Sequence, residues 1–420
     1  MSADPTRRAL LAGGLAAIAA PALAQGIVAE RDSSGRLRFP DPRRAPPIDF
    51  ARFVPQPVRI EAVEMWRTPG DNRLVRVRSV DGAEGVVRAS TKAESTHEFF
   101  TRYAVPRFTG QDARTLPDLI RRAAREDYEV AGLPYWSALG QVELAVWDLL
   151  GRVARRSCAE MIGPVLRRSI PVYMSSNKRD TSPEEEVAHL QQRVAETGAR
   201  AIKLKIGRRM GYNDDAAPGR SEQVIRLARR SFGDPMTIYA DANGAYDSIR
   251  ALEVAAMLED HGVAMFEEPC PFEDFDMTRQ VTEAMRKRGS RLKIAGGEQD
   301  YALERWRWLA ERRALDVVQP DLIYVGGIVR NLAILRMTRA AGLRYNPHFP
   351  RSGADTAPML HLCAVAPDLW GYQEYRSRPD RQDYGHEPVL APKNGELPVP
   401  LGPGWGIDYD PSIWRTAERL

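Results

Sequence analysis

Cysteine is scarce in this 420-residue chain, and lysine is much rarer than arginine. The three cysteines, Cys158, Cys270 and Cys363, are odd in number and lie far apart. Disulfide frameworks and zinc sites use cysteines in pairs or short clusters, so this spacing fits neither. We therefore expect three buried free thiols. The scarcity of lysine also makes the position of each lysine informative.

The chain also lacks a large excess of charge of either sign. Lys+Arg 60 against Asp+Glu 56 gives a net charge of only +4, and the basic residues are spread along the sequence. A nucleic-acid-binding surface needs clustered basic residues, so we expect no nucleic-acid partner. The hydrophobic fraction of 43% is ordinary for a globular protein, and the length allows a large barrel plus a second domain.

Long apolar runs are absent after the N-terminus. Residues 1–24 contain the pair Arg7-Arg8, then an Ala/Leu-rich stretch that ends in Ala22-Leu23-Ala24. This pattern is typical of a twin-arginine export signal, and the stretch is short for a bilayer span of about 20 residues. We expect cleavage near Ala24, a periplasmic mature protein and no membrane association after cleavage.

The next two segments predict a linker and a small domain. Residues 25–57 are rich in Pro, Arg and Asp without periodicity, which is typical of a linker or extended arm. Strands at 58–62 and 73–80, on either side of the turn-forming residues 68–72, predict a β-hairpin. Helical periodicity follows from about residue 96. We expect a small α+β domain over 58–169, with residues 376–420 packed back on it.

Residues 170–375 alternate short apolar strands with amphipathic helices, which predicts an α/β fold with a (β/α)-barrel. The helix after the first strand carries clear signals, because Ser182-Pro183-Glu184-Glu185 is a capping box and Gly198 ends the helix. The predicted strands are 170–174, 201–205, 237–241, 263–267, 292–296, 317–318, 344–346 and 370–373.

Polar side chains stand at or just beyond the C-terminal ends of these strands. They are Lys203, Lys205, Asp241, Asn243, Glu267, Glu268, Glu298, Asp321, His348 and Glu374. Active sites of such barrels lie at this end of the strands. Packing alone does not explain why apolar strands finish in ionisable groups, so we predict an active site there.

Three of the carboxylates, Asp241, Glu267 and Glu298, come from successive strands. A single acid at a strand end is usually just solvated. Three that converge would repel one another unless a cation lay between them, and hard oxygen ligands favour Mg²⁺, with Mn²⁺ as the alternative. We therefore predict a divalent-metal site.

The scarce lysines contribute two members of the set. Lys203 and Lys205 point to the same side of their strand, and we expect them to lower each other's pKa, which would make a lysine base. His348 lies across the barrel, where Asp321 can bond one ring nitrogen and leave the other to exchange protons. Glu374 falls between the two sides and can donate a hydrogen bond if it is protonated.

As a set these residues resemble the enolase superfamily, and within it the mandelate racemase subgroup. The resemblance covers residues 58 to 375 and rests on AIKLKIG, YADANG, FEEP, GGE, QPD and NPH. It implies a modified (β/α)-barrel under an N-terminal α+β capping domain. In the capping domain, residues 85–88 lack an acidic residue often seen in relatives, and we expect a loop there.

Carried over by position, the resemblance implies that Asp241, Glu267 and Glu298 bind Mg²⁺. Lys205 would be the base on one face of the substrate, with Lys203 assisting it.

On the opposite face His348, paired with Asp321, would act as the acid or base. Glu374 would donate a hydrogen bond to the enolate, and Asn243 would contact a substrate hydroxyl. Glu268 would play a supporting part beside the metal ligand that precedes it.

These parts predict removal of the proton next to the carboxylate of a small-molecule substrate. We favour dehydration of a sugar acid, an aldonate or aldarate, with racemisation or epimerisation of a 2-hydroxy acid and lactone cycloisomerisation as alternatives. A periplasmic carboxylate-binding protein is the non-enzyme alternative. Lys178, Arg179 and Arg351 are candidates to bind a distal carboxylate, and we expect loops 67–72 and 175–179 to set specificity. Relatives commonly form homo-oligomers, which we expect here.

Overall fold

The computed structural model describes residues 29–44, 48–70, 72–376 and 385–420. The predicted export signal, residues 1–24, lies outside the described residues and stays a prediction. Within the described part of the chain, no helix has both the length and the apolar character that crossing a membrane requires. All three cysteines are buried and free, as expected.

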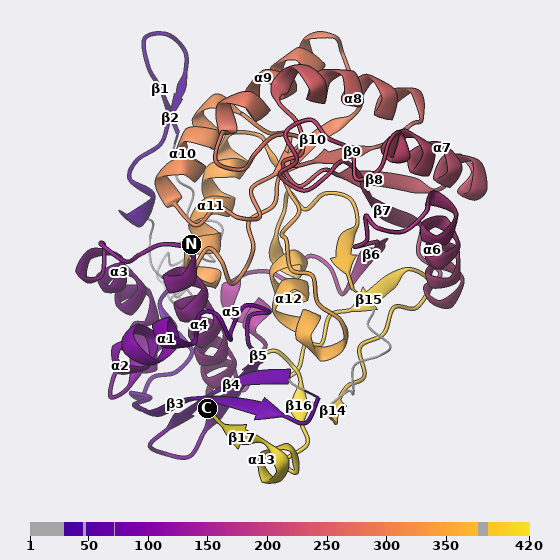
Figure 1. Ribbon diagram of the computed structural model, residues 1–420. Coiled ribbons are helices and arrows are strands. Elements are labelled where there is room, and N and C mark those ends of the chain that lie inside the picture. Colours follow the sequence, from indigo (N-terminus) through magenta and orange to yellow (C-terminus); the bar gives the residue numbers. More distant parts are fainter. Residues whose placement is uncertain (1–28, 45–47, 71, 377–384) are drawn as a thin grey trace, which may run out of the picture.

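Eight parallel strands form the barrel of the larger domain (Figure 1), in the order β13-β6-β7-β8-β9-β10-β11-β12. The strands are β6 (Ser169–Ser175), β7 (Ala201–Lys205), β8 (Thr237–Asp241), β9 (Met265–Glu267), β10 (Lys293–Gly296), β11 (Val317–Val318), β12 (Arg344–Tyr345) and β13 (Gln373–Tyr375). The helices that follow them are α6 (Pro183–Thr197), α7 (Arg220–Phe232), α8 (Ser248–Asp260), α9 (Phe275–Lys287), α10 (Leu303–Arg312), α11 (Ile328–Ala340) and α12 (Ala357–Val365). The predicted modified (β/α)-barrel is confirmed.

The local signals in the sequence explain where several elements begin and end. Ser182 and Glu185 form the expected capping box of α6, and Gly198 ends that helix with φ 67°. A positive φ at this point favours glycine, which has no Cβ to clash. The predicted strands at 201–205, 237–241 and 317–318 match β7, β8 and β11 residue for residue.

The last strand was predicted too early, at 370–373, whereas β13 spans Gln373–Tyr375. The residues before β13 instead bond to β12, because Trp370 donates its N–H to the Tyr345 carbonyl at 2.9 Å. The side-chain amide of Asn346 also donates to the carbonyls of Trp370 and Tyr372, both at 2.9 Å. This segment therefore bridges β12 to β13 and completes the ring.

The smaller domain contains an antiparallel sheet of β3 (Ile60–Thr68), β4 (Asn72–Ser79) and β5 (Glu84–Arg88). Its helices are α1 (His97–Phe99), α2 (Val105–Phe108), α3 (Leu116–Glu126), α4 (Leu133–Ala154) and α5 (Cys158–Ile162), with a π-helical segment (Phe100–Ala104) between α1 and α2. Strand β3 extends beyond the predicted range of 58–62. Residues 85–88 belong to strand β5 and do not form the expected loop. At Gly85 an added Cβ would lie 2.1 Å from the Ala145 carbonyl oxygen, so glycine lets β5 lie against α4.

The C-terminal segment contacts both domains. Its strand β17 (Glu418–Arg419) pairs with β3, while β15 (Glu396–Pro398) pairs antiparallel with β6 of the barrel. The remaining elements of the segment are β14 (His386–Glu387), β16 (Asp408–Tyr409) and α13 (Ile413–Thr416).

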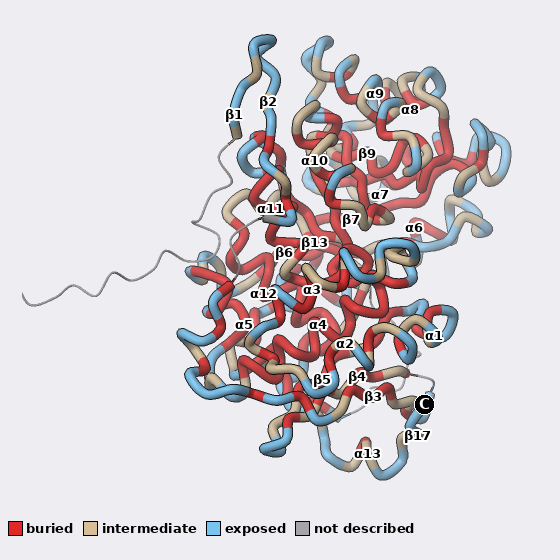
Figure 2. The backbone as a smooth tube through the Cα atoms, turned by 90° about the vertical axis from the view of Figure 1, so that its left-hand side faces the viewer, coloured by how far each residue is buried: buried red, intermediate tan, exposed pale blue. Residues whose placement is uncertain are grey.

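The predicted arm contains a short hairpin, β1 (Glu30–Arg31) and β2 (Leu37–Arg38), which stands out from the body at the top of Figure 2. Beyond it the segment is no simple spacer, because Phe39, Ile48, Phe50 and Val54 are buried in the core.

Candidate active site

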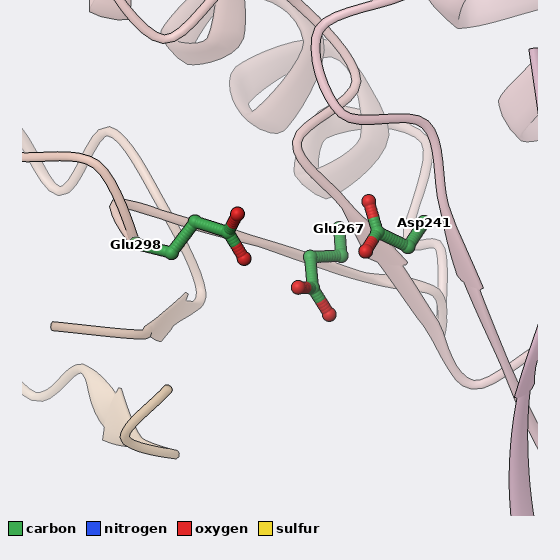
Figure 3. Close-up of side chains that lie close together, drawn as sticks. All are labelled: Asp241, Glu267 and Glu298. Atoms are coloured by element: carbon green, nitrogen blue, oxygen red, sulfur yellow. The ribbon is translucent and has the colours of Figure 1, made fainter. Parts of the chain in front are cut away.

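Strand ends bring the three predicted acids together. Asp241 ends β8, Glu267 ends β9, and Glu298 follows β10 by two residues. One ligand oxygen from each lies within 4.8 Å of the others, and all three residues are buried. Figure 3 shows the carboxylates turned toward a common space, with Glu267 between Asp241 and Glu298.

Two lysine ammonium groups contact this acidic cluster from β7. Lys203 Nζ donates to both carboxylate oxygens of Glu267, at 3.0 and 2.9 Å. Lys205 Nζ contacts Asp241, to which the strand register pairs it, and lies 3.1 Å from Asn243 Oδ1. Tyr173 of β6 completes the packing, since its ring centroid lies 5.2 Å from Lys203 Nζ.

His348 contacts the cluster from the other end. Its Nδ1 lies 2.7 Å from Asp321 Oδ2, and Asp321 is itself fixed by the backbone N–H groups of Ile323 and Tyr324 at 2.8 Å. The Nε2 atom lies 3.1 Å from Glu298 Oε2. Burial alone would lower the pKa of His348, but Glu298 and Asp321 outweigh it and raise the pKa to about 9.

The expected lowering of the lysine pKa values is not seen for Lys203. Burial lowers the pKa of this ammonium group, but the carboxylates of Glu267 and Glu374 outweigh burial and raise the pKa well above its usual value. The neighbouring carboxylates, rather than the second lysine, decide its charge. Lys203 is therefore a hydrogen-bond donor in this structure.

Glu374 differs from its expected role as a protonated donor. Burial raises the pKa of this carboxyl, but Lys203 and His348 outweigh burial and lower the pKa to about 2. Its carboxylate oxygens lie 3.8 Å from Lys203 Nζ and 3.8 Å from His348 Nε2. Glu374 therefore lies between the lysine side and the histidine side, where its strand position predicted it, but as an ionised carboxylate rather than a protonated donor.

Asn243 lies beside the lysine side of the site. Its Oδ1 accepts from Lys205 Nζ and from Arg179 Nη2, at 3.1 and 2.9 Å, and its Nδ2 donates to Glu268 Oε2 at 3.2 Å. Glu268, expected in a supporting part, is buried against this amide. In this structure Asn243 positions the Lys205 side chain.

The three candidates for binding a distal carboxylate lie in different surroundings. Arg179 Nε donates to the Gly207 carbonyl at 2.9 Å, and its Nη2 is shared between Asn243 and the Asp241 carbonyl. Lys178 is exposed. Arg351, by contrast, is buried at the junction with the smaller domain, where its Nη2 lies 3.3 Å from the Ala89 carbonyl oxygen.

Two family models match this arrangement. The Enolase C-terminal domain-like model covers residues 185–413, and the model of the mandelate racemase / muconate lactonizing enzyme N-terminal domain covers residues 55–163. The chain belongs to the enolase superfamily. Its place in the mandelate racemase subgroup, expected from the sequence, is confirmed, and the smaller domain corresponds to the N-terminal domain of that group.

Relatives of the superfamily support this assignment over most of the chain. Arabinonate dehydratase from Saccharolobus solfataricus is 28% identical over 302 residues, 70% of this chain and 74% of the relative. Chloromuconate cycloisomerase from Cupriavidus necator is 28% identical over 353 residues, 82% of this chain and 89% of the relative. The solved structure of a racemase candidate from Roseobacter denitrificans matches with TM-score 0.78 and 34% identity, covering 86% of this chain and 99% of that one.

These relatives settle the general class of activity. They are dehydratases, cycloisomerases and racemases, so this chain is an enzyme of lyase or isomerase type. The alternative of a carboxylate-binding protein finds no support. Enzymes of this superfamily use Mg²⁺ with a lysine or histidine base.

The donor set fits a divalent cation. Asp241, Glu267 and Glu298 supply three converging buried carboxylates, which is the hard-oxygen set that Mg²⁺ prefers. The pKa of Glu267 is raised to about 7 by burial and by Asp241, which is the repulsion that a cation between them would relieve.

Sequence reasoning missed the contribution of Tyr173 and the contacts between the two domains. Arg88, at the end of β5, pairs with Asp355 of the barrel at 2.9 Å, and both side chains are nearly buried. Arg88 and Asp355 are 267 residues apart in the chain, so no local pattern could have joined them. The β-branched pair Val86-Val87 was the available signal for β5.

Proposed function

We propose that this superfamily member is a Mg²⁺-dependent dehydratase of a sugar acid, an aldonate or an aldarate. The observation that carries the proposal is that the two proton-carrying side chains contact the outer members of the acidic triad. Lys205 Nζ contacts Asp241, and His348 Nε2 lies 3.1 Å from Glu298. A substrate carboxylate held between them would present its neighbouring carbon to a base and an acid on different sides.

Asp241, Glu267 and Glu298 would hold the metal ion. When bound, the ion would neutralise the charge that develops on the substrate carboxylate as the adjacent proton leaves. Lys203 would share that task, because its buried ammonium group is already protonated and needs no reorganisation to donate a hydrogen bond. Mn²⁺ is the alternative ion, since it accepts the same oxygen ligands.

The bond changes in a dehydration follow from these positions. Lys205 Nζ takes the proton from C2 as the C–H bond breaks. The C3–O bond then breaks with its electron pair going to oxygen, and His348 Nε2 donates a proton so that water leaves. Asp321 holds Nδ1 at 2.7 Å, which keeps Nε2 directed at the substrate. The enol that remains becomes a 2-keto-3-deoxy acid.

The test is ¹H NMR of the protein with Mg²⁺ in D₂O, against pooled aldonates and aldarates. We expect loss of an α-proton signal and growth of a dehydrated product, both abolished by EDTA. The Lys205→Met and His348→Asn variants should each lose product formation by about 100-fold or more. Lys287→Met is the matched control, because Lys287 is exposed at the end of α9 and should keep full activity. No metal-dependent exchange with any acid in the pool would refute the proposal.

Racemisation or epimerisation is the second candidate. It is supported by the 34% identity to the racemase candidate and by the same placement of Lys205 and His348. In the NMR experiment it would give deuterium at the α-carbon with inverted configuration and no dehydrated product. Lactone cycloisomerisation would instead consume a sugar-acid lactone added to the same assay.

We propose further that the enzyme is exported to the periplasm and works as a homo-oligomer. The export proposal rests on Arg7-Arg8 and the apolar stretch that follows them. A reporter fused to residues 1–30 should reach the periplasm, and Arg7→Lys with Arg8→Lys should retain it in the cytoplasm. Light scattering of the purified protein tests the oligomer, and the mass of a single chain, which is at most 47.0 kDa, would be the contradictory result.

A further inference from the structure

Arg351 is a buried guanidinium beside the proposed site. It follows His348 by three residues on the loop after β12, and only 8% of it is exposed. Its backbone is fixed on both sides, because its N–H donates to the Phe349 carbonyl and its carbonyl accepts from the N–H of Arg376, at 2.8 and 2.9 Å. Arg376 stands two residues after Glu374, so Arg351 lies between the strand ends that carry His348 and Glu374.

The hydrogen bonds of this guanidinium are incomplete. Of its five N–H donors, Nη2 reaches the Ala89 carbonyl oxygen at 3.3 Å, and among the described residues Nε is buried without any acceptor. The ring of Phe349 covers one side, with its centroid 5.1 Å from Cζ. Burying a charged donor without acceptors is unfavourable unless a ligand supplies them.

The nearby carboxylates already have partners. Asp321 accepts from His348 and two backbone N–H groups, and Asp355 pairs with Arg88 at 2.9 Å. Burial and the nearby charge of Arg88 both lower the pKa of Arg351. The charges of Asp355 and Asp321 oppose this lowering, but each of these carboxylates is already bonded to another side chain.

The location of this charge suits the far end of a substrate. The reacting carboxylate would lie at the acidic triad, with the adjacent carbon between Lys205 and His348. The rest of the carbon chain must then leave the triad. Arg351 lies beyond His348, where the Ala89 backbone of the smaller domain meets the barrel. A planar guanidinium with free N–H groups binds a carboxylate through two parallel hydrogen bonds.

We propose that Arg351 binds a second carboxylate at the distal end of the substrate, so that the enzyme acts on an aldarate rather than an aldonate. This inference rests on the proposed function. It assigns to Arg351 alone the task that the sequence divided among three residues, because Arg179 is held by backbone carbonyls and Lys178 is exposed.

The test compares acids that share a skeleton but differ at the far end, glucarate with gluconate and galactarate with galactonate. The Mg²⁺-loaded wild type should turn over one aldarate with a higher kcat/KM than its aldonate. Arg351→Gln should lower kcat/KM for that aldarate about 10- to 100-fold, mainly through KM, and leave the aldonate within about threefold. Arg351→Lys keeps the charge but loses the planar guanidinium, so its kcat/KM for the aldarate should fall between those of the wild type and Arg351→Gln. Lys287→Gln removes an exposed charge at the end of α9 and should change the kcat/KM for neither acid.

Several outcomes would overturn the inference. They are a wild type that prefers the aldonate, an Arg351→Gln variant that loses both acids equally, and an Arg351→Lys variant that also loses both. If Arg351→Gln does not fold, Arg351→Lys and the wild-type preference still decide. Failure of the proposed function looks different, because neither acid would then show Mg²⁺-dependent loss of its α-proton with any variant.

Discussion

Replacing the buried His361 should change how the stability of this enzyme depends on pH. His361 is fully buried on α12, where Nδ1 accepts from the Ala159 N–H at 3.1 Å and Nε2 donates to the Pro400 carbonyl at 2.8 Å. Burial lowers its pKa from 6.5 to about 4, although the hydrogen bonds to Pro400 and Trp405 oppose the shift. A second proton would remove the lone pair that accepts from Ala159.

The magnitude follows from linkage. Between pH 6.5 and 4 the unfolded chain binds a proton at this histidine and the folded chain does not, so stability falls as the pH falls through this window. The loss approaches about 1.4 kcal/mol per pH unit and reaches about 2 kcal/mol at pH 5. Above pH 6.5 His361 is neutral in both states, so its full contribution to the free energy of unfolding is present. His361→Gln keeps one acceptor and one donor but does not titrate.

Urea unfolding at pH 7.5 and pH 5.0, followed by tryptophan fluorescence, measures this effect. The wild type should lose about 2 kcal/mol more than His361→Gln over that interval. His189→Gln, a change at an exposed histidine on α6, should follow the wild type. Parallel losses in the wild type and His361→Gln would refute the argument that burial lowers this pKa.

Three further changes test the metal site and the packing between domains. Asp241→Asn should abolish the rise in the thermal midpoint that Mg²⁺ causes, because it removes a charged ligand of the triad; an undiminished rise would contradict the site. Trp405→Ala should lower the free energy of unfolding in urea by about 3–5 kcal/mol, since Trp405 is 2% exposed and its indole N–H donates to the Leu144 carbonyl. A loss below about 1 kcal/mol would show that this tryptophan of the C-terminal segment contributes little to stability. Gly327→Ala should lower the thermal midpoint, because the added Cβ would lie 2.1 Å from Glu143 Oε2 and the residue would keep a φ of 95°. Clash and backbone strain together should cost about 2 kcal/mol or more. An unchanged midpoint would refute the clash.

The sequence determined the barrel and most of the polar set, because both depend on local patterns. Strand β7 ends in Lys203-Leu204-Lys205. Helix α6 begins at the capping box of Ser182 and ends at Gly198. Parallel strands present their C-terminal ends at one edge, so Asp241 and Glu267 had to meet once the strands were adjacent. The superfamily assignment followed from the same residues.

Only the tertiary structure decided the electrostatics and the junction between the domains. The charge on Lys203 and Glu374 depends on which carboxylates and cations surround each one, and these neighbours come from different strands. The difference between Arg179, held by backbone carbonyls, and Arg351, short of acceptors, is likewise invisible in the sequence. Both arginines have the same chemistry, and the contacts that separate them join residues far apart in the chain.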